Sequence, residues 1–232
     1  MRTWSRTFVL FALCVTLAGC DFCGMSSIEG STKRFVTTVP QGYVSSYILD
    51  VGEGKVVLID AGGNAEATEI TDALGKMGKS LSDVEAIVLT HAHSDHIAGL
   101  AALGSLPIYA HPGVKTQLGE ETSATLTKEI ADGSRITFGA RTLEFFHMPG
   151  HSPGSVNIIV DGMVFFGDTA ASDKEGKVRL SPGFFTDDAE QNLNDLKGFA
   201  SKVEGVEVDT MFFSHSAPLT GKAELEAFVA GL

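Results

Sequence analysis

The run His91-Ala92-His93-Ser94-Asp95-His96 constrains this chain more than any other feature of its sequence. It follows the apolar segment 84–89, whose continuous hydrophobicity is typical of a buried strand. His91 and His93 are two residues apart in an extended segment, so their side chains project to the same side. Imidazole and carboxylate groups suit zinc, and also iron or manganese. A solvated polar loop is the alternative, but the sequence favours a metal-binding loop at the end of a rigid strand.

Three later positions repeat this context, because each has an apolar, strand-like stretch that ends in His or Asp beside small residues. They are His151, Asp168 and His215. Side chains at strand ends can meet along one rim of a sheet even when they are far apart in sequence. Asp60 also follows an apolar run, 55–59, and precedes Gly62. From this context alone it is expected to form a turn at the strand end.

The alternation of apolar and polar residues predicts one domain with two sheets and outer helices. A chain of 232 residues with 44% hydrophobic and 20% charged residues is long enough for a full core. Strands are expected at 34–40, 44–50, 55–60, 84–89, 107–110, 135–138, 141–148, 155–160, 163–166 and 209–213. Helices are expected at 65–78, near 112–118, at 187–203 and at 221–231. Strands mixed with helices indicate an α/β fold with a two-sheet core.

The N-terminal segment has the features of an export signal. Arg2 and Arg6 precede the apolar residues 8–18, which are about half the roughly 20 residues that a membrane-spanning helix needs. The segment Leu17-Ala18-Gly19-Cys20 resembles a bacterial lipobox, which implies cleavage before Cys20 and lipid attachment to its thiol. Plain secretion is the alternative. We therefore expect a signal peptide over 1–19, a lipidated tether over 20–34 and one folded domain over 35–232.

These features predict an exported lipoprotein that is anchored to a membrane and faces the periplasm or the cell exterior. Asp21, directly after the expected lipid-bearing residue, resembles an inner-membrane retention signal. Cys14 falls in the removed segment and Cys23 in the tether, so the predicted domain has no Cys to serve as a metal ligand. The net charge of −12 argues against nucleic acid as a partner. The sequence does not predict an oligomeric state.

The polar motifs together resemble those of the metallo-β-lactamase superfamily, over about residues 35–232. Asp60 matches the first motif, the run from His91 to His96 the second, His151 the third, Asp168 the fourth and His215 the fifth. The resemblance implies a four-layer αββα sandwich of two mixed sheets flanked by helices. It also implies that one ion is held by His91, His93 and His151, that a second is held by Asp95, His96 and His215, and that Asp168 bridges them. Asp60 would orient a ligand or the loop by accepting a hydrogen bond.

The resemblance further implies two Zn²⁺ ions, with iron or manganese as other possible metals. Two ions can share one water and lower its pKa, so a bridging hydroxide exists near neutral pH. Asp95 would be the catalytic residue that orients the hydroxide or takes its proton, besides binding metal. The expected reaction is hydrolysis of an acyl bond of a small molecule, and phosphoester hydrolysis is a weaker expectation.

Departures from other branches of the superfamily narrow this expectation. Zinc β-lactamases generally have Cys or Ser where Asp168 stands. Flavodiiron proteins replace the second His of the cluster with Glu and add a flavodoxin domain, and RNA-processing members carry large inserted domains. Glyoxalase II adds a C-terminal helical domain, whereas about 17 residues follow His215 here. A compact glyoxalase-II-like or lactonase-like hydrolase is the remaining interpretation.

Three alternatives remain open at this point: a mononuclear-iron persulfide dioxygenase, an exported β-lactamase and a non-catalytic metal-binding lipoprotein. Residues 171–190, with Pro182-Gly183-Phe184-Phe185, are a candidate apolar wall for substrate, or else ordinary core packing. Tyr43 is a weaker candidate for the same rim. His111 and His147 match no motif and are expected to be structural or surface residues.

Overall fold

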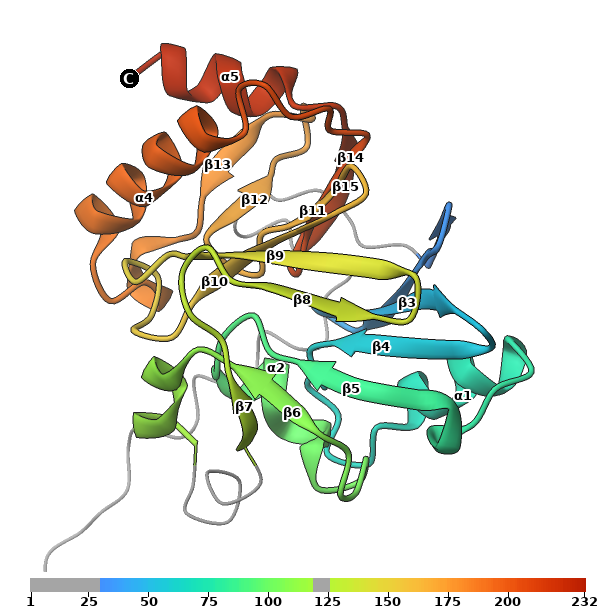
Figure 1. The fold of residues 1–232 in the computed structure, drawn as a ribbon. Helices are drawn as coiled ribbons and strands as arrows, with labels where there is room; N and C mark the ends of the chain where they lie inside the picture. Colours follow the sequence, from blue (N-terminus) through green and yellow to red (C-terminus); the bar gives the residue numbers. More distant parts are fainter. Residues whose placement is uncertain (1–29, 119–125) are drawn as a thin grey trace, which may run out of the picture.

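The structure is a computed structural model that describes residues 30–118 and 126–232. The predicted signal peptide, Cys20 and the tether up to residue 29 lie outside the described residues. Figure 1 shows two sheets packed against each other, with helices on their outer sides. Over the described residues, no helix is long and apolar enough to cross a membrane.

The first sheet has seven strands that follow one another in chain order. Strands β1 to β4 are antiparallel, and β4 to β7 are parallel. Helix α1 (Thr68–Lys76) makes the crossover between the parallel strands β4 and β5, as parallel pairing requires. The strands are β1 (Thr32–Lys33), β2 (Val36–Gln41), β3 (Val44–Gly52), β4 (Lys55–Ile59), β5 (Val84–Val88), β6 (Ile108–Ala110) and β7 (Leu126–Glu129).

The second sheet has six strands in the order β15-β14-β11-β10-β9-β8. Its one parallel pair, β11 with β14, is connected through helix α4 (Ala189–Lys202). The strands are β8 (Arg135–Phe138), β9 (Arg141–His147), β10 (Val156–Val160), β11 (Met163–Phe165), β14 (Thr210–Phe213) and β15 (Ser216–Thr220). The hairpin of β12 (Ala170–Ser172) with β13 (Val178–Leu180) is separate, and helix α5 (Ala223–Ala230) follows β15.

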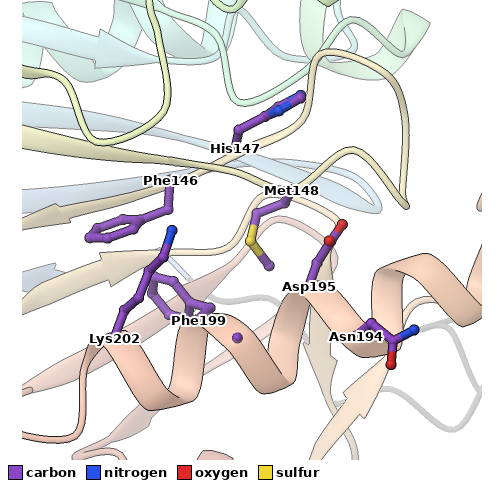
Figure 2. Close-up of a pocket in the computed structure, with 8 residues that line it drawn as sticks. Phe146, His147, Met148, Asn194, Asp195, Phe199 and Lys202 are labelled. Carbon is purple, nitrogen blue, oxygen red and sulfur yellow. The ribbon is translucent and has the colours of Figure 1, made fainter.

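Each sheet buries its outer face under helices. Ile70 and Leu74 of α1 are fully buried and pack with the first sheet's outer residues. On the second sheet, Leu196 and Phe199 of α4 do the same. Figure 2 shows Phe199 on α4 close to Phe146 of β9. Each helix is therefore held by one apolar stripe, which is what an amphipathic helix on a sheet requires.

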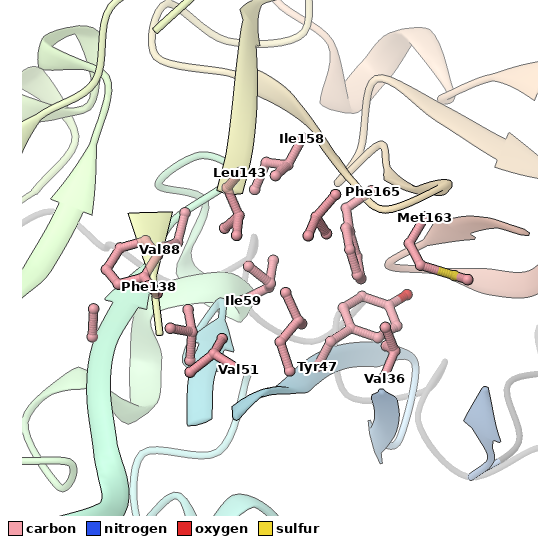
Figure 3. Packing of buried hydrophobic residues seen from close by; sticks show 14 of the residues in the cluster. Val36, Tyr47, Val51, Ile59, Val88, Phe138, Leu143, Ile158, Met163 and Phe165 are labelled. Carbon is pink, nitrogen blue, oxygen red and sulfur yellow. The ribbon is translucent and has the colours of Figure 1, made fainter. Parts of the chain in front are cut away.

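The central core lies between the two sheets. Tyr47 and Ile59 of the first sheet pack with Phe165 and Leu143 of the second, and all four are buried (Figure 3). Burying a side chain of this size contributes about 1.5–3 kcal/mol. The Tyr47 hydroxyl donates a 2.8 Å hydrogen bond to the Phe213 carbonyl, so a polar contact also joins the sheets.

The predicted fold class is confirmed, with two mixed sheets between layers of helices. Each expected strand is present within about two residues of its predicted bounds. The expected helix near 112–118 is instead the 3₁₀ segment η3 (Pro112–Thr116), with Pro112 in its first turn. A Cβ on Gly113 would lie 2.2 Å from the Pro153 carbonyl oxygen, so this turn is pressed against a neighbouring loop. Strands β1, β7, β12, β13 and β15 were not expected. Strand β1 lies in the predicted tether, where Thr32 and Lys33 pair with β2 as part of the first sheet.

Candidate metal centre

The seven residues predicted as ligands meet at one edge of the two sheets, because each follows a strand. His91 and His93 follow β5, and the short helix α2 (Ser94–Ile97) then carries Asp95 and His96. From the second sheet, His151 follows β9, Asp168 follows β11, and His215 lies in the turn between β14 and β15. Their role as ligands stays a prediction, but the structure places them together.

Four of these residues form the first group, with ligand atoms that all lie within 4.8 Å of one another: His91, His93, His151 and Asp168. His93 Nδ1 is 3.1 Å from both His91 Nε2 and His151 Nε2. Asp168 Oδ2 completes the group, 3.7 Å from His91 Nε2 and 3.8 Å from His151 Nε2. Three imidazole nitrogens and a carboxylate thus surround one point.

Asp95, His96 and His215 form the second group. His215 Nε2 lies 3.3 Å from Asp95 Oδ2. Asp168 also reaches this group, because its Oδ1 is 3.3 Å from His96 Nε2 and its Oδ2 is 3.0 Å from His215 Nε2. Asp168 therefore stands between the two groups, where a bridging ligand would have to be.

Two imidazoles are fixed by a hydrogen bond from the nitrogen that faces away from the cluster. His96 Nδ1 donates to Asp60 Oδ2 over 2.8 Å, and His215 Nδ1 donates to the Tyr43 carbonyl over 2.7 Å. A neutral imidazole that donates through Nδ1 has its lone pair on Nε2. In both residues Nε2 is the atom that faces the cluster, so the lone pair of the neutral form points where a metal would bind.

Threonine hydroxyl groups orient the imidazoles of His91 and His151 in the same way. Thr90 Oγ1 gives its proton to Asp60 Oδ2 over 2.7 Å, so it accepts from His91 Nδ1 over 3.1 Å. Thr186 Oγ1 lies 3.3 Å from His151 Nδ1 and can accept in the same way. These anchors were not predicted from the sequence. Thr90 directly precedes His91, so its position was a usable signal, whereas Thr186 is far from His151 in sequence.

Asp60 is buried below the cluster and adopts φ 62°, in the left-handed region that non-glycine residues seldom occupy. Its carboxylate accepts from the Thr90 backbone N–H over 2.7 Å, in addition to the Thr90 hydroxyl and His96. These bonds join the ends of β4 and β5. Asp60 thus orients one imidazole directly and a second, that of His91, through Thr90.

Burial and neighbouring charge set the protonation of the cluster. Burial lowers the pKa of His151 to about 4, and burial also lowers the pKa values of His91 and His93. Burial acts against the charge on Asp168, but His215 and His96 hold the pKa of this carboxyl well below its usual range. Burial disfavours the charged forms of His96 and His215, but Asp168 outweighs it and raises both pKa values. Neutral imidazoles and an ionised carboxylate are the forms that bind a metal ion, so a metal that binds at the second group must displace the protons of these two imidazoles.

The residues present fit two metal ions. Among the described residues, buried His96 Nε2 and Asp168 Oδ1 have no hydrogen-bond partner, although they face each other across 3.3 Å. Buried polar atoms without partners are rare and costly, and a bound cation would satisfy both. Five imidazoles with two carboxylates suit zinc or a similar transition metal, and the absence of thiolate leaves iron and manganese possible.

Other polar features of the described chain lie outside this cluster. The rings of His111 and His147 stack with centroids 3.7 Å apart, and His147 Nε2 is 2.9 Å from the Pro153 carbonyl oxygen. A cavity of about 150 Å³ beside Phe146 and Lys202 contains none of the seven residues (Figure 2). The chemistry of the cluster, and not this cavity, identifies the candidate site.

A family model described as the metallo-beta-lactamase superfamily matches residues 39–215, which include Asp60 and all seven clustered residues. The chain therefore belongs to the metallo-beta-lactamase superfamily, as the motifs predicted. This membership is shown over most of the chain.

Curated relatives carry the name hydroxyacylglutathione hydrolase. The relative from Aeromonas hydrophila is 32% identical over 138 residues, which are 59% of this chain and 51% of the relative. The relative from Aeromonas salmonicida is 31% identical over 144 residues, covering 62% of this chain and 53% of the relative. The chain thus spans about half the length of the curated relatives it matches.

Solved structures with this fold include a metallo-beta-lactamase from Pontibacter korlensis. It has a TM-score of 0.70 and 19% identity, and the match covers 88% of this chain and 98% of that one. A subclass B3 metallo-beta-lactamase of Bradyrhizobium japonicum has a TM-score of 0.66 and 19% identity, with 90% and 92% covered. At these identities the likeness shows the fold alone.

Proposed function

We propose that this protein is a dinuclear zinc hydrolase that cleaves an ester, thioester or lactone bond of a small molecule. The observation that carries the proposal is the position of Asp168, within 3.8 Å of four imidazoles that belong to two ligand groups. Relatives named hydroxyacylglutathione hydrolase support a hydrolytic reaction.

When bound, two zinc ions would polarise the acyl carbonyl and lower the pKa of water, which supplies a nucleophile near neutral pH. The first group would hold one ion, the second group the other, and Asp168 both. Asp168 and Asp95 together offset part of the positive charge of two ions. The anchored imidazoles need little rearrangement to bind, because their orientation is fixed beforehand.

Hydrolysis adds the oxygen of water to the acyl carbon and breaks the bond to the leaving oxygen or sulfur. The protons of water end on the carboxylic acid and on the released alcohol or thiol. Asp95 is half-buried, and its Oδ2, 3.3 Å from His215 Nε2, is the chain's candidate to orient the water and accept its proton. Nearby Ser152 and Ser155 are buried and bond to each other over 2.9 Å, so neither is placed as a nucleophile.

The experiment is a substrate panel of lactones, thioesters, β-lactams and phosphoesters on zinc-loaded protein, repeated with His93→Ala and Asp168→Ala. We expect turnover of an acyl substrate, lost by at least a hundredfold in either variant. Activity that survives either change would show that the mechanism is wrong. Circular dichroism of each variant serves as the control for folding.

Metal analysis, oxygen uptake and the substrate panel distinguish this hydrolase from the three alternative functions. One equivalent of iron with oxygen uptake would identify a persulfide dioxygenase, and preferential β-lactam cleavage would identify a β-lactamase. A metal-loaded protein that turns over no member of the panel would favour a non-catalytic metal-binding lipoprotein.

We also propose that the domain is exported and anchored to a membrane by lipid on Cys20, after removal of residues 1–19. The support is the sequence Leu17-Ala18-Gly19-Cys20. Expression with a labelled fatty acid tests this, since Cys20→Ala should abolish labelling and membrane retention. The matched change Cys23→Ala should leave both intact. Equal labelling of the Cys20→Ala protein would refute lipidation at that residue.

A further inference from the structure

Residues 181–187 form a rim segment beside the metal cluster. At one end, the Ser181 hydroxyl donates to the Asp168 carbonyl. At the other end, the Asp187 N–H donates to the His151 carbonyl over 3.0 Å, and Thr186 contacts the His151 ring. Because both ends are tied to predicted ligands, the residues between them are held next to the site.

Between these anchors, the turn η4 (Gly183–Phe185) exposes two aromatic side chains. Phe184 is 73% exposed and Phe185 54% exposed, and their rings pack on each other with centroids 4.2 Å apart. Core packing, one of the two sequence-based interpretations of this segment, is therefore wrong for these two residues. Two adjacent phenylalanines that stay largely exposed to water favour a contact surface over core packing.

Tyr43, in the turn between β2 and β3, is a third exposed aromatic side chain beside the cluster, and Tyr43, Phe184 and Phe185 are together called the aromatic rim. The Tyr43 carbonyl accepts from His215, and its ring stacks on the His215 ring at 5.9 Å with an interplanar angle of 7°. Five large hydrophobic residues are exposed in the described part of the chain, and Tyr43, Phe184 and Phe185 are three of them. Exposed apolar area is thus concentrated in segments that hydrogen-bond to the cluster.

The sequence segments that form the cluster and the aromatic rim contain no Lys or Arg. The ligand loops and the rim fall in stretches of sequence without Lys or Arg: 37–54, 80–114, 142–173, 180–196 and 203–221. Asp187 and Asp188 follow the aromatic turn and add negative charge. The nearest basic residue in sequence, Arg179, is paired with buried Asp173 at 2.8 Å.

We propose that the substrate carries an uncharged, apolar group on the far side of its scissile bond, and that Tyr43, Phe184 and Phe185 contact this group. This inference rests on the proposed acyl hydrolase function. A glutathione thioester, in contrast, carries one ammonium group and two carboxylates remote from the reacting carbonyl, so its net charge is negative. The described rim offers these carboxylates no basic side chain and places Asp187 nearby, so such a substrate is disfavoured although curated relatives bear its name.

The test compares two lactoyl thioesters that differ only in the thiol, glutathione or benzyl mercaptan, on the zinc-loaded full chain. We expect kcat/KM at least tenfold higher for the benzyl thioester. Added salt should raise kcat/KM for the glutathione thioester alone, because salt screens the repulsion between its carboxylates and Asp187 and Asp188.

Substitution of both rim phenylalanines, Phe184→Ser with Phe185→Ser, should lower kcat/KM for the benzyl thioester about tenfold, mainly through KM. The glutathione thioester should change less than twofold, and zinc content should stay the same. Val206→Ser, which removes an exposed hydrophobic residue beyond α4, is the matched control and should change neither rate.

A higher kcat/KM for the glutathione thioester, or equal losses of kcat/KM for both substrates in the double variant, would overturn the proposed role of the aromatic rim. Either result would leave the proposed hydrolase function intact. Zinc-loaded protein that cleaves neither thioester nor any other acyl substrate would overturn both proposals. The two failures are therefore distinguishable.

Discussion

At the scale of single residues, the imidazoles of the cluster are set by groups that never touch a metal. Asp60, Thr90 and the Tyr43 carbonyl hold Nδ1 of three histidines and leave Nε2 facing the site. The sequence predicted the seven clustered residues, because His and Asp at strand ends are recognisable without coordinates. It could not predict which nitrogen faces the cluster, since that depends on backbone geometry.

The acceptor role of Asp60 gives the first prediction. In Asp60→Asn, the two carboxylate oxygens become one oxygen and one N–H₂ group. The side chain can then no longer accept all the hydrogen bonds that Thr90 and His96 now donate to it. His96 then keeps its proton on the wrong nitrogen, so we expect zinc affinity to fall about 10- to 100-fold. Competition with a chelator measures this. Asp50→Asn, which keeps the acceptor for the Gly52 N–H, is the control, and equal affinity in both variants would contradict the assignment.

His151 gives a prediction about pH. Burial holds its pKa at about 4, whereas the unfolded residue takes up a proton near 6.5. As pH falls from 7 to 4, the unfolded state gains a proton that the folded state does not, so the free energy of unfolding decreases. The loss from this one group is on the order of 3 kcal/mol.

Chelated wild type and chelated His151→Asn, which lacks the titrating ring, should show this in urea unfolding at several pH values. Wild type should lose stability relative to the variant between pH 6.5 and pH 4, because groups common to both proteins cancel. A constant difference across this range would show that burial does not shift the pKa of His151.

At the scale of elements, the loop after β9 and the start of α4 are fitted closely. Gly150 accepts a hydrogen bond from the Asp188 N–H and donates one to the Asp195 carboxylate. A Cβ on Gly150 would lie 2.0 Å from the Asn192 backbone nitrogen. Gly150→Ala must therefore push α4 away from the His151 loop. We expect it to cost at least 3 kcal/mol in the free energy of unfolding, measured by chemical denaturation.

Gly198→Ala is the matched control within the same helix. Nothing lies within 4 Å of a Cβ at this position, so alanine should stabilise α4 by about 0.5–1 kcal/mol. Similar stability of the two variants would contradict the close packing of α4 on Gly150.

Elements were predictable where hydrophobic runs were long. Strand β15 was missed because Pro218 interrupts it, and proline is tolerated here because β15 is an edge strand. Strands β12 and β13 have three residues each, too few for a pattern. The expected helix at 112–118 is a shorter 3₁₀ segment, in which Gly113 approaches the Pro153 backbone too closely for a Cβ.

At the scale of the whole molecule, three hydrophobic clusters stabilise the fold without the metal site. One lies between the sheets and two lie beneath the helices. We therefore expect chelation to abolish turnover and lower Tm by mass action, but to leave the far-ultraviolet circular dichroism nearly unchanged. Complete unfolding on chelation would show that the metals, and not the cores, hold the sheets together.

The central claim is that residues from both sheets form one two-ion site around Asp168. Metal analysis of purified, zinc-replete protein tests it most directly, in wild type and in Asp168→Ala. We predict two equivalents of zinc per wild-type chain, and at most one in the variant. Two equivalents in both proteins, or a single equivalent of iron in wild type, would contradict this account.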